Sequence, residues 1–390
     1  MDEGTPQLQG ITVLNLASVG PAARAARTLA DYGARVIQIG PTVRKAGKQI
    51  KPPFHSYGAG RGFERIRIDL KSEAGREAFL RLAEMADVVL ESYRPGVVDR
   101  LGIGFEAVRA RKHDIVYCST TGYGQDGPAA SWAGHDINYL AMSGFLACSE
   151  PRSDGGPPIP GATVADSAGG GMHAVLSILA ALVRRSLGGA AQHLDVSAAE
   201  GVVSLMSLSL DQYLATGEVS GPRQVLLTGR YACYDLYPCR DGKWISVGAI
   251  EPHFYRNLCG LLGVDRWVDH QMDDAVQDEI RKDFREAFQK RDRDDWVERL
   301  ASRDTCVAPV NDLAEVAEDP HFRARGIFQE AEHPEEGPFH QVGPVLAGGH
   351  RGLGRVQVRS FDESDVDQVM KDAGFTGAEV AELLSSGAVE

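Results

Sequence analysis

Residues 11–39 read ITVLNLASVGPAARAARTLADYGARVIQI and predict a strand, a helix and a second strand. The opening run is short and apolar, and Pro21 suits the first turn of an Ala- and Leu-rich helix over Ala22–Tyr32. Gly33 ends that helix, and Arg35–Ile39 forms the next strand. Because a helix that crosses between two strands leaves them parallel, these residues predict an α/β fold with a parallel sheet.

The same alternation continues along the chain. We expect strands over Ile66–Asp69, Asp87–Glu91 and Ile115–Ser119, with a capped helix over Ser72–Met85 between the first two. A further helix is predicted over Asp166–Arg185, where apolar residues recur at helical spacing. No G-x-G-x-x-G follows the first strand, so the sequence carries no dinucleotide-binding fingerprint.

The pattern of predicted strands and helices changes near residue 229. Tyr231–Tyr237 and Lys243–Val247 flank Arg240-Asp-Gly242 and predict a hairpin, and helical segments follow it. We therefore expect a large α/β domain over 1–190, a linker over 191–228, a small α+β domain over 229–325, and a C-terminal segment over 326–390 that returns to the large domain.

The net charge of −13 excludes some classes of partner for this 390-residue chain. A general nucleic-acid binder needs a broad basic face, and so does a protein that docks on anionic membranes, so we expect neither partner. The N-terminus lacks the features of a signal peptide, and the apolar run Ala174–Val183 is too short to span a bilayer. We expect a cytoplasmic protein, with reduced cysteines and no metal site, because the six cysteines lack zinc-site spacing.

A cluster of cations interrupts this acidic sequence between residues 44 and 71. Eight Lys and Arg side chains are opposed there by Glu64 and Asp69 alone, a surplus of six positive charges. Such a cluster would attract a polyanion such as the 3′-phosphate and pyrophosphate of coenzyme A, but a solvated loop would have the same composition. The cations are Arg44, Lys45, Lys48, Lys51, Arg61, Arg65, Arg67 and Lys71.

Three titratable residues stand where catalysis is possible, and each also has a plain structural explanation. His135 lies beyond the predicted strand 115–119, where it could act as a general base or simply pack its loop. Asp166 could exchange a proton or attack a thioester beside amides of the Gly169-Gly-Gly171 turn that hold an oxyanion, or it could only cap the helix. Glu251 could orient a catalytic histidine, or it could only favour the positive end of a helix.

Together these segments resemble the family III CoA transferases and, within them, the α-methylacyl-CoA racemases. The similarity covers nearly the whole chain, and its discriminating pieces are Gly134-His-Asp-Ile-Asn-Tyr139 and Gly248-Ala-Ile-Glu-Pro252. Transferases of the family keep the aspartate that matches Asp166 but typically lack the histidine and this glutamate.

The resemblance implies a fold and a set of roles. The fold is a large Rossmann-like domain with a smaller α+β domain, in an interlocked homodimer whose active site lies between the large domain of one chain and the small domain of the other. His135 and Asp166 match acid/base groups on the two faces of the α-carbon of an acyl-CoA, and Glu251 matches a glutamate that supports the histidine. Coenzyme A is then part of the substrate, and no prosthetic group is implied. The expected acyl-CoA contacts are Arg44, Arg61, Ile68, Asp69, Leu70, Lys71, Arg94, Gly134, Asp136, Ile137, Asn138 and Tyr139.

Two departures from the racemase pattern fall in the expected CoA-contact region. Ile39-Gly-Pro41 replaces an acidic residue, Arg and Pro, and Phe63-Glu64 replaces a basic pair. Our hypothesis is an enzyme that interconverts (2R)- and (2S)-2-methylacyl-CoA by moving the α-proton. The alternatives are a CoA transferase that forms a mixed anhydride on Asp166, and a non-catalytic acyl-CoA-binding protein.

Overall fold

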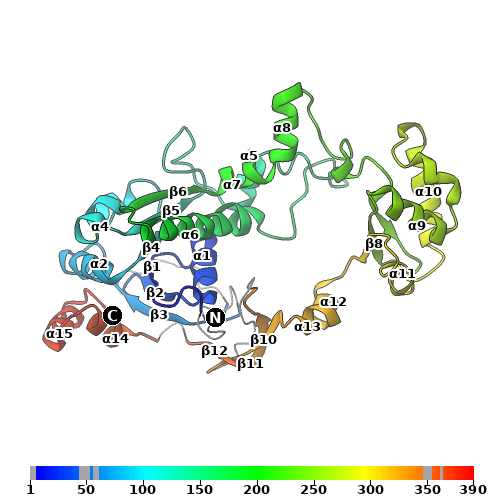
Figure 1. The fold of residues 1–390 in the computed structure, drawn as a ribbon. Helices are drawn as coiled ribbons and strands as arrows, with labels where there is room; N and C mark the ends of the chain where they lie inside the picture. The colour runs from blue at the N-terminus through cyan, green and yellow to red at the C-terminus, as the bar shows by residue number, and fades with distance from the viewer. Residues whose placement is uncertain (1–5, 44–52, 56–60, 346–353, 361–362) are drawn as a thin grey trace. The chain divides into compact units, whose positions relative to one another are not determined.

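The computed structural model describes residues 6–43, 53–55, 61–345, 354–360 and 363–390 (Figure 1). The chain forms two compact units, and each is built from separate stretches of sequence. The first unit contains residues 1–143, 160–207 and 320–390, and the second contains residues 144–159 and 208–319.

A six-stranded sheet forms the centre of the first unit, in the order β3-β2-β1-β4-β5-β6. All neighbouring strands in it are parallel, which confirms the predicted parallel α/β sheet. The order is that of the doubly wound nucleotide-binding folds, in which ligands bind beyond the carboxyl ends of the strands. The strands are β1 (Thr12–Asn15), β2 (Arg35–Gly40), β3 (Phe63–Arg67), β4 (Val88–Glu91), β5 (Val116–Thr121) and β6 (Gln192–Ser197).

Helices cover both faces of this sheet (Figure 1). Successive residues of one strand enter different cores: Val13 packs with α1 (Gly20–Asp31) and α6 (His173–Ser186), whereas Leu14 packs with α2 (Glu73–Met85). Burial on two faces explains why the central strands read as continuous apolar runs rather than as alternating ones. The second face also receives α3 (Val97–Leu101), α4 (Phe105–Arg111), α14 (Val366–Asp372) and α15 (Gly377–Ser386).

The predicted linker over 191–228 is wrong at its beginning, because Gln192–Ser197 forms β6 at the edge of the sheet. His193 and Asp195 are exposed, whereas Val196 is buried. Because the exposed positions of this edge strand are polar, the sequence lacks the continuous apolar run by which the central strands were recognised. The helices α7 (Ala198–Leu205) and α8 (Ser207–Thr216) follow.

The second unit contains an antiparallel sheet, and its β7 (Tyr234–Pro238) and β8 (Trp244–Gly248) form the predicted hairpin. Helices over residues 252–300 pack on the sheet around buried aromatic side chains that include Tyr237, Phe284 and Phe288. The unit's other regular elements are β9 (Val307–Pro309), α9 (Pro252–Leu262), α10 (Gln277–Phe288), α11 (Arg293–Leu300), α12 (Leu313–Glu318) and the 3-10 turns η3 (Leu226–Thr228), η4 (Asp265–His270) and η5 (Asp274–Val276).

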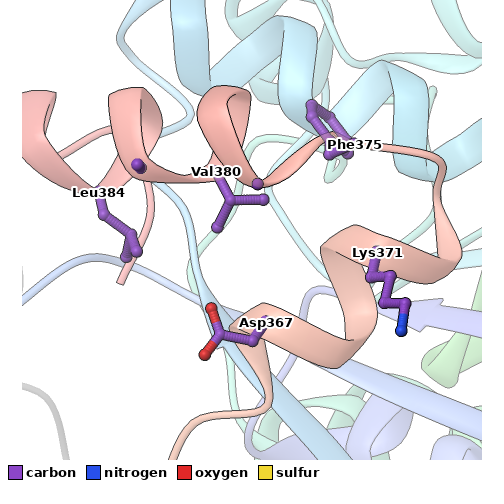
Figure 2. A pocket seen from close by; sticks show the side chains of 7 residues that line it. Asp367, Lys371, Phe375, Val380 and Leu384 are labelled. Atoms are coloured by element: carbon purple, nitrogen blue, oxygen red, sulfur yellow. The ribbon is translucent and has the colours of Figure 1, made fainter.

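The C-terminal segment packs within the first unit, and the last residues pair with the end of β3. Arg67 and Glu390 exchange two backbone hydrogen bonds of 2.9 Å, and Asp69 N–H donates to the Ala388 carbonyl. A hollow of about 450 Å³ lies beside α14 and α15, and none of the predicted site residues lines it. Figure 2 shows the side chains that line this hollow. Residues 320–390, which complete the first unit, also form α13 (Pro320–Ala324), β10 (Phe328–His333), β11 (Gly337–Val342) and β12 (Val356–Gln357).

One helical stretch, Ala165–Ser186, is long and apolar enough to cross a membrane by length and composition. This is weak evidence for a span, because Ala174 and Ile178 pack into the core of the first unit and core helices pass the same test. The opposite side of the stretch leaves Leu176 and Val183 exposed.

Close backbone contact fixes α7 against a π-helical turn, η2 (Ala165–Met172), that leads into α6. A Cβ atom on Gly201 would lie 1.9 Å from the Gly169 carbonyl oxygen. We therefore expect Gly201→Ala to lower the free energy of unfolding by roughly 1–3 kcal/mol, because one helix must move. Gly377→Ala is the control, since its Cβ would meet nothing within 4 Å. Urea unfolding of both variants checks this, and a Gly201→Ala protein as stable as the wild type would contradict it.

A buried carboxyl group, Glu91, ends β4 and is 1% exposed. Its Oε2 accepts the Tyr93 N–H at 2.7 Å. Burial raises the pKa of Glu91 from 4.5 to about 7, although hydrogen bonds from Ser119 and Tyr93 oppose the shift.

The folded protein therefore holds a proton that the unfolded chain loses between pH 4.5 and about 7. Stability from this group is present at low pH and is lost as the pH rises through that range. Glutamine cannot ionise, so we expect the free energy of unfolding of Glu91→Gln to fall less than that of the wild type between about pH 5 and about pH 8. Urea unfolding at several pH values measures this. Glu106→Gln on α4 is the exposed control, and equal slopes for the wild type and Glu91→Gln would contradict the burial argument.

Candidate active site

The main chain at His135 is held by the start of α5 (Asp136–Met142). His135 is exposed, and its N–H donates to Asn138 Oδ1 at 3.0 Å, so Asn138 closes the first turn of the helix. The Tyr139 hydroxyl donates to the Gly134 carbonyl at 2.6 Å, on the other side of the histidine. These two bonds fix the backbone from which the His135 ring projects.

Gly134 is required there because Tyr139 lies against the backbone. A Cβ atom on Gly134 would come within 2.7 Å of the Tyr139 ring and 2.8 Å of the Tyr123 hydroxyl. The Tyr123 and Tyr139 rings meet edge to face with centroids 5.0 Å apart. Burial, and after it the negative charge of Asp166, raises the pKa of Tyr139 to about 12, so Tyr139 remains a protonated donor near neutral pH.

Asp166 is the second residue of the π-helical turn η2. The interpretation of Asp166 as a helix N-cap is wrong, because Val164 occupies that position and is itself helical. Single π-helical turns within helices occur frequently at functional sites. The Asp166 backbone N–H donates to Asp136 Oδ1 at 2.9 Å, which connects η2 directly to the residue after His135.

The structure thus brings His135 and Asp166 into one electrostatic environment. Burial is the largest influence on Asp166 and raises its pKa. Arg24 opposes that shift, Asp136 adds to it, and His135 lowers the pKa slightly. His135 is therefore one of the charged groups that surround the Asp166 carboxyl group, and its role as an acid or base stays a prediction.

The prediction that amides near Asp166 and the Gly169–Gly171 turn hold an oxyanion is wrong. The Asp166 N–H is bonded to Asp136, and the glycines are buried inside the helix. A Cβ atom on Gly170 would lie 2.6 Å from the Pro21 side chain. The glycines are therefore explained by the close packing of η2 against α1 and α7.

Arg24 is a site residue that the sequence analysis missed. It projects from α1, and its Nη1 lies 3.4 Å from Asp166 Oδ2. The available signal was weak: an arginine one turn after Pro21, on a helix that carries a second arginine, Arg27, three residues later. Nothing in that pattern identifies a partner 142 residues away in the chain.

Glu251 belongs to the second unit and directly precedes α9. Its side chain is exposed and makes no capping hydrogen bond to that helix. The role of supporting His135 stays a prediction.

Part of the predicted CoA-contact set has structural partners instead. Arg61 is 6% exposed, donates to the Val342 carbonyl at 2.7 Å and pairs with Asp31 at 3.3 Å. The guanidinium of Arg61 is thus buried among partners of its own chain, and its contact with coenzyme A stays a prediction. Arg65 is likewise buried and donates to the Ser360 carbonyl. Arg44 and its neighbours Lys45, Lys48 and Lys51 lie outside the described residues.

The remaining predicted contacts come after β3, β4 and β5 in the chain. Ile68 and Asp69 are buried, whereas Lys71 and Arg94 are exposed and Leu70 is half-buried. Ile137 is exposed beside His135, and Asp136 and Asn138 have the hydrogen bonds described above. Among the described residues, no three His, Cys, Asp or Glu side chains are grouped so that they could hold a metal ion.

The departures from the racemase pattern also have structural partners. Glu64 accepts two hydrogen bonds of 2.7 Å from Arg35, so its charge is balanced within the sheet. Phe63 is buried in the core between the sheet and α1, and Gly40 pairs with Arg67 in the register of β2 and β3.

The sequence pattern described as CoA-transferase family III matches residues 8–355. The chain belongs to CoA-transferase family III. It is 33% identical over 391 residues to "Alpha-methylacyl-CoA racemase" of Homo sapiens, covering 98% of this chain and 97% of that one. It is 26% identical over 401 residues to "Succinyl-CoA:glutarate CoA-transferase" of Homo sapiens, covering 98% and 90%. The solved structure of a CAIB/BAIF family protein from Brucella suis matches with a TM-score of 0.73 at 25% identity, covering 94% of this chain and 98% of that one.

These findings confirm the resemblance to the family and the mixed α/β fold with its parallel sheet. They also show that racemases and CoA transferases of the family both match over most of this chain. Family membership therefore supports an acyl-CoA racemase or transferase, and the choice between the two depends on the site.

The contact between Asp136 and Asp166 gives a direct test of the site's electrostatics. Asp136→Asn removes a negative charge that raises the pKa of Asp166, while the asparagine Oδ1 can still accept the Asp166 N–H. We therefore expect a lower pKa for Asp166 in this variant. Carboxyl ¹³C NMR of Asp-labelled protein measures it, with Asp166→Asn to assign the signal and Asp126→Asn as an exposed control. An unchanged or higher pKa in Asp136→Asn would contradict the arrangement.

Proposed function

We propose that this protein is an α-methylacyl-CoA racemase, which interconverts (2R)- and (2S)-2-methylacyl-CoA thioesters. The observation that carries the proposal is the hydrogen bond from the Asp166 N–H to Asp136 Oδ1, which holds the backbone of η2 against the residue that follows His135. The matches to racemases agree with it, at 33% identity for the human protein.

The chemistry requires two groups. The α-hydrogen of a thioester is weakly acidic because the carbanion delocalises as an enolate, so a positioned base can remove it. A second group must return a proton to the opposite face for the configuration to change. His135 and Asp166 are assigned these roles, and the acyl-CoA is bound as the substrate.

The surroundings of Asp166 suit proton transfer from carbon. A carboxylate whose pKa is raised by burial is a stronger base than an exposed one, and catalysis improves as the pKa approaches the working pH. A transferase that forms a mixed anhydride needs only the nucleophilic carboxylate. A histidine coupled to that carboxylate has no evident use in such a reaction, so His135 favours the racemase.

The segment that binds coenzyme A is proposed at the carboxyl ends of β3 and β4. Lys71 and Arg94 are exposed there and could pair with phosphates. Ligands of doubly wound sheets bind beyond these strand ends.

An interlocked homodimer is part of the proposal and follows the family resemblance. A stripe of exposed apolar side chains on η2 and α6 supports it, because such stripes mark surfaces that another protein covers. The stripe consists of Met172, Leu176, Val183 and Leu187. The proposed role of Glu251 beside His135 also rests on the resemblance.

The test is α-proton exchange. We expect the protein to incorporate deuterium at the α-carbon of (2R)-2-methylacyl-CoA in D₂O and to produce the (2S) form. His135→Ala and Asp166→Ala should each slow exchange by roughly two to four orders of magnitude, because each removes an acid/base group. His113→Ala and Asp278→Ala are matched controls, exposed in the structure and outside the site.

Two other outcomes would identify the alternatives. Transfer of CoA to a free carboxylic acid without α-exchange, with ping-pong kinetics and an adduct on Asp166, would establish a CoA transferase. Tight acyl-CoA binding with neither reaction would establish a binding protein. Either result would reject the racemase.

A further inference from the structure

We propose that Arg24 is a positioning residue that orients the Asp166 carboxylate and determines which of the two acid/base groups carries the proton before substrate binds. The inference rests on the proposed function, because it assigns the resting state of that same site. The family resemblance implies no role for Arg24.

Arg24 is held in place independently of Asp166. Its Nη2 donates to Thr163 Oγ1 at 2.7 Å, and its Nη1 donates to the Gly20 carbonyl at 3.3 Å. The same Nη1 lies 3.4 Å from Asp166 Oδ2, and the two side chains are only 20% and 17% exposed. A cation anchored at other points needs little rearrangement to hold a carboxylate, and partial burial strengthens the attraction.

Glycines set the distance between the two elements that carry the pair. A Cβ atom on Gly171 would lie 3.2 Å from the Arg24 Cβ, and one on Gly170 would overlap Pro21. Larger residues would push α1 away from η2 and lengthen the contact between Arg24 and Asp166. The glycine run therefore serves the site by placing the guanidinium rather than by binding an oxyanion.

The charges around Asp166 come from three places. Burial raises its pKa, and Arg24 on α1 is the strongest opposing influence. At the start of α5, Asp136 raises the pKa and His135 lowers it, while the Tyr139 hydroxyl on the same helix is a neutral neighbour. Without Arg24, burial and Asp136 would still raise the pKa of Asp166, and only His135 would lower it. The Asp166 carboxyl group would then hold its proton to higher pH.

This balance assigns the resting state. The ion pair with Arg24 keeps Asp166 as the carboxylate before substrate binds, so Asp166 accepts the α-proton and His135 supplies the returning one. In the reaction the α C–H bond breaks as an O–H bond forms on Asp166, and the His135 N–H bond breaks as the new C–H bond forms on the other face. The enzyme then holds its proton on Asp166 and returns to the resting state by exchange with water.

Arg24→Gln tests the proposal, with Arg24→Lys as the conservative variant and Arg109→Gln, an exposed arginine on α4, as the control. We expect Arg24→Gln to lower kcat/KM for α-deuteration by roughly ten- to a hundredfold, because the carboxylate loses its orientation. The acid limb of the pH profile should move to higher pH, because removing a cation raises the pKa of the carboxyl group. Arg24→Lys should restore the position of the limb, and Arg109→Gln should match the wild type.

Carboxyl ¹³C titration of Asp166 keeps the inference separate from the proposed function. Its pKa should rise in Arg24→Gln and move in the opposite direction in Asp136→Asn, whether or not the protein exchanges α-protons. A wild-type protein without exchange would reject the racemase, while this titration would still decide the effect of Arg24. An unchanged pKa in Arg24→Gln would overturn the inference. So would a loss of activity that follows thermal stability in both Arg24 variants and leaves the acid limb in place.

Discussion

The close packing of η2 against α1 and α7 is the constraint on which the site depends. Gly170 lies against Pro21, and Gly201 lies against the backbone of Gly169, at distances that no Cβ atom could share. These contacts place Asp166 within reach of a cation on α1 and of the residues around His135 on α5. The backbone of Asp166 is thus positioned by close contacts of glycines, while Arg24 holds its carboxylate, and the site inherits the rigidity of the helices around it.

Much of the fold could be predicted because long periodic segments dominate its core. The strands at Thr12–Asn15 and Val88–Glu91 read as short apolar runs, which are typical of a sheet covered on both faces, and the Asp-Gly turn predicts the hairpin of the second unit. The edge strand Gln192–Ser197 was missed because its solvent face carries His193 and Asp195, which weaken the apolar signal. The division into units was also mispredicted at residues 144–159, because the chain leaves the first unit and returns to it within a stretch that has little regular structure.

The site was predictable only in part, and the reason is the sequence distance between its members. His135 and Asp166 were identified through a family resemblance, since each alone has a plain structural explanation. Arg24 contacts Asp166 across 142 residues, and Arg61 contacts Val342 across 281, so no local pattern could reveal that one arginine serves the site and the other the fold. In the sequence both arginines are simply cations. Their burial and their hydrogen-bond partners in the structure distinguish Arg24 from Arg61.

The relation between the two activities of the family can be argued from the same carboxylate. A desolvated aspartate beside an anchored arginine is a competent nucleophile for a thioester and equally a base for the α-carbon, so the aspartate alone does not select a reaction. The selecting group must come from what faces it. In the proposed racemase that group is His135, immediately before α5, and its backbone is fixed by Asn138 and by the Tyr139 hydroxyl on the Gly134 carbonyl. A histidine at that position supplies the second proton donor that racemisation needs, and a residue without a titratable group would leave only the nucleophile. The choice of reaction would then depend on one side chain at the end of a loop, while the glycines that position the aspartate could stay the same.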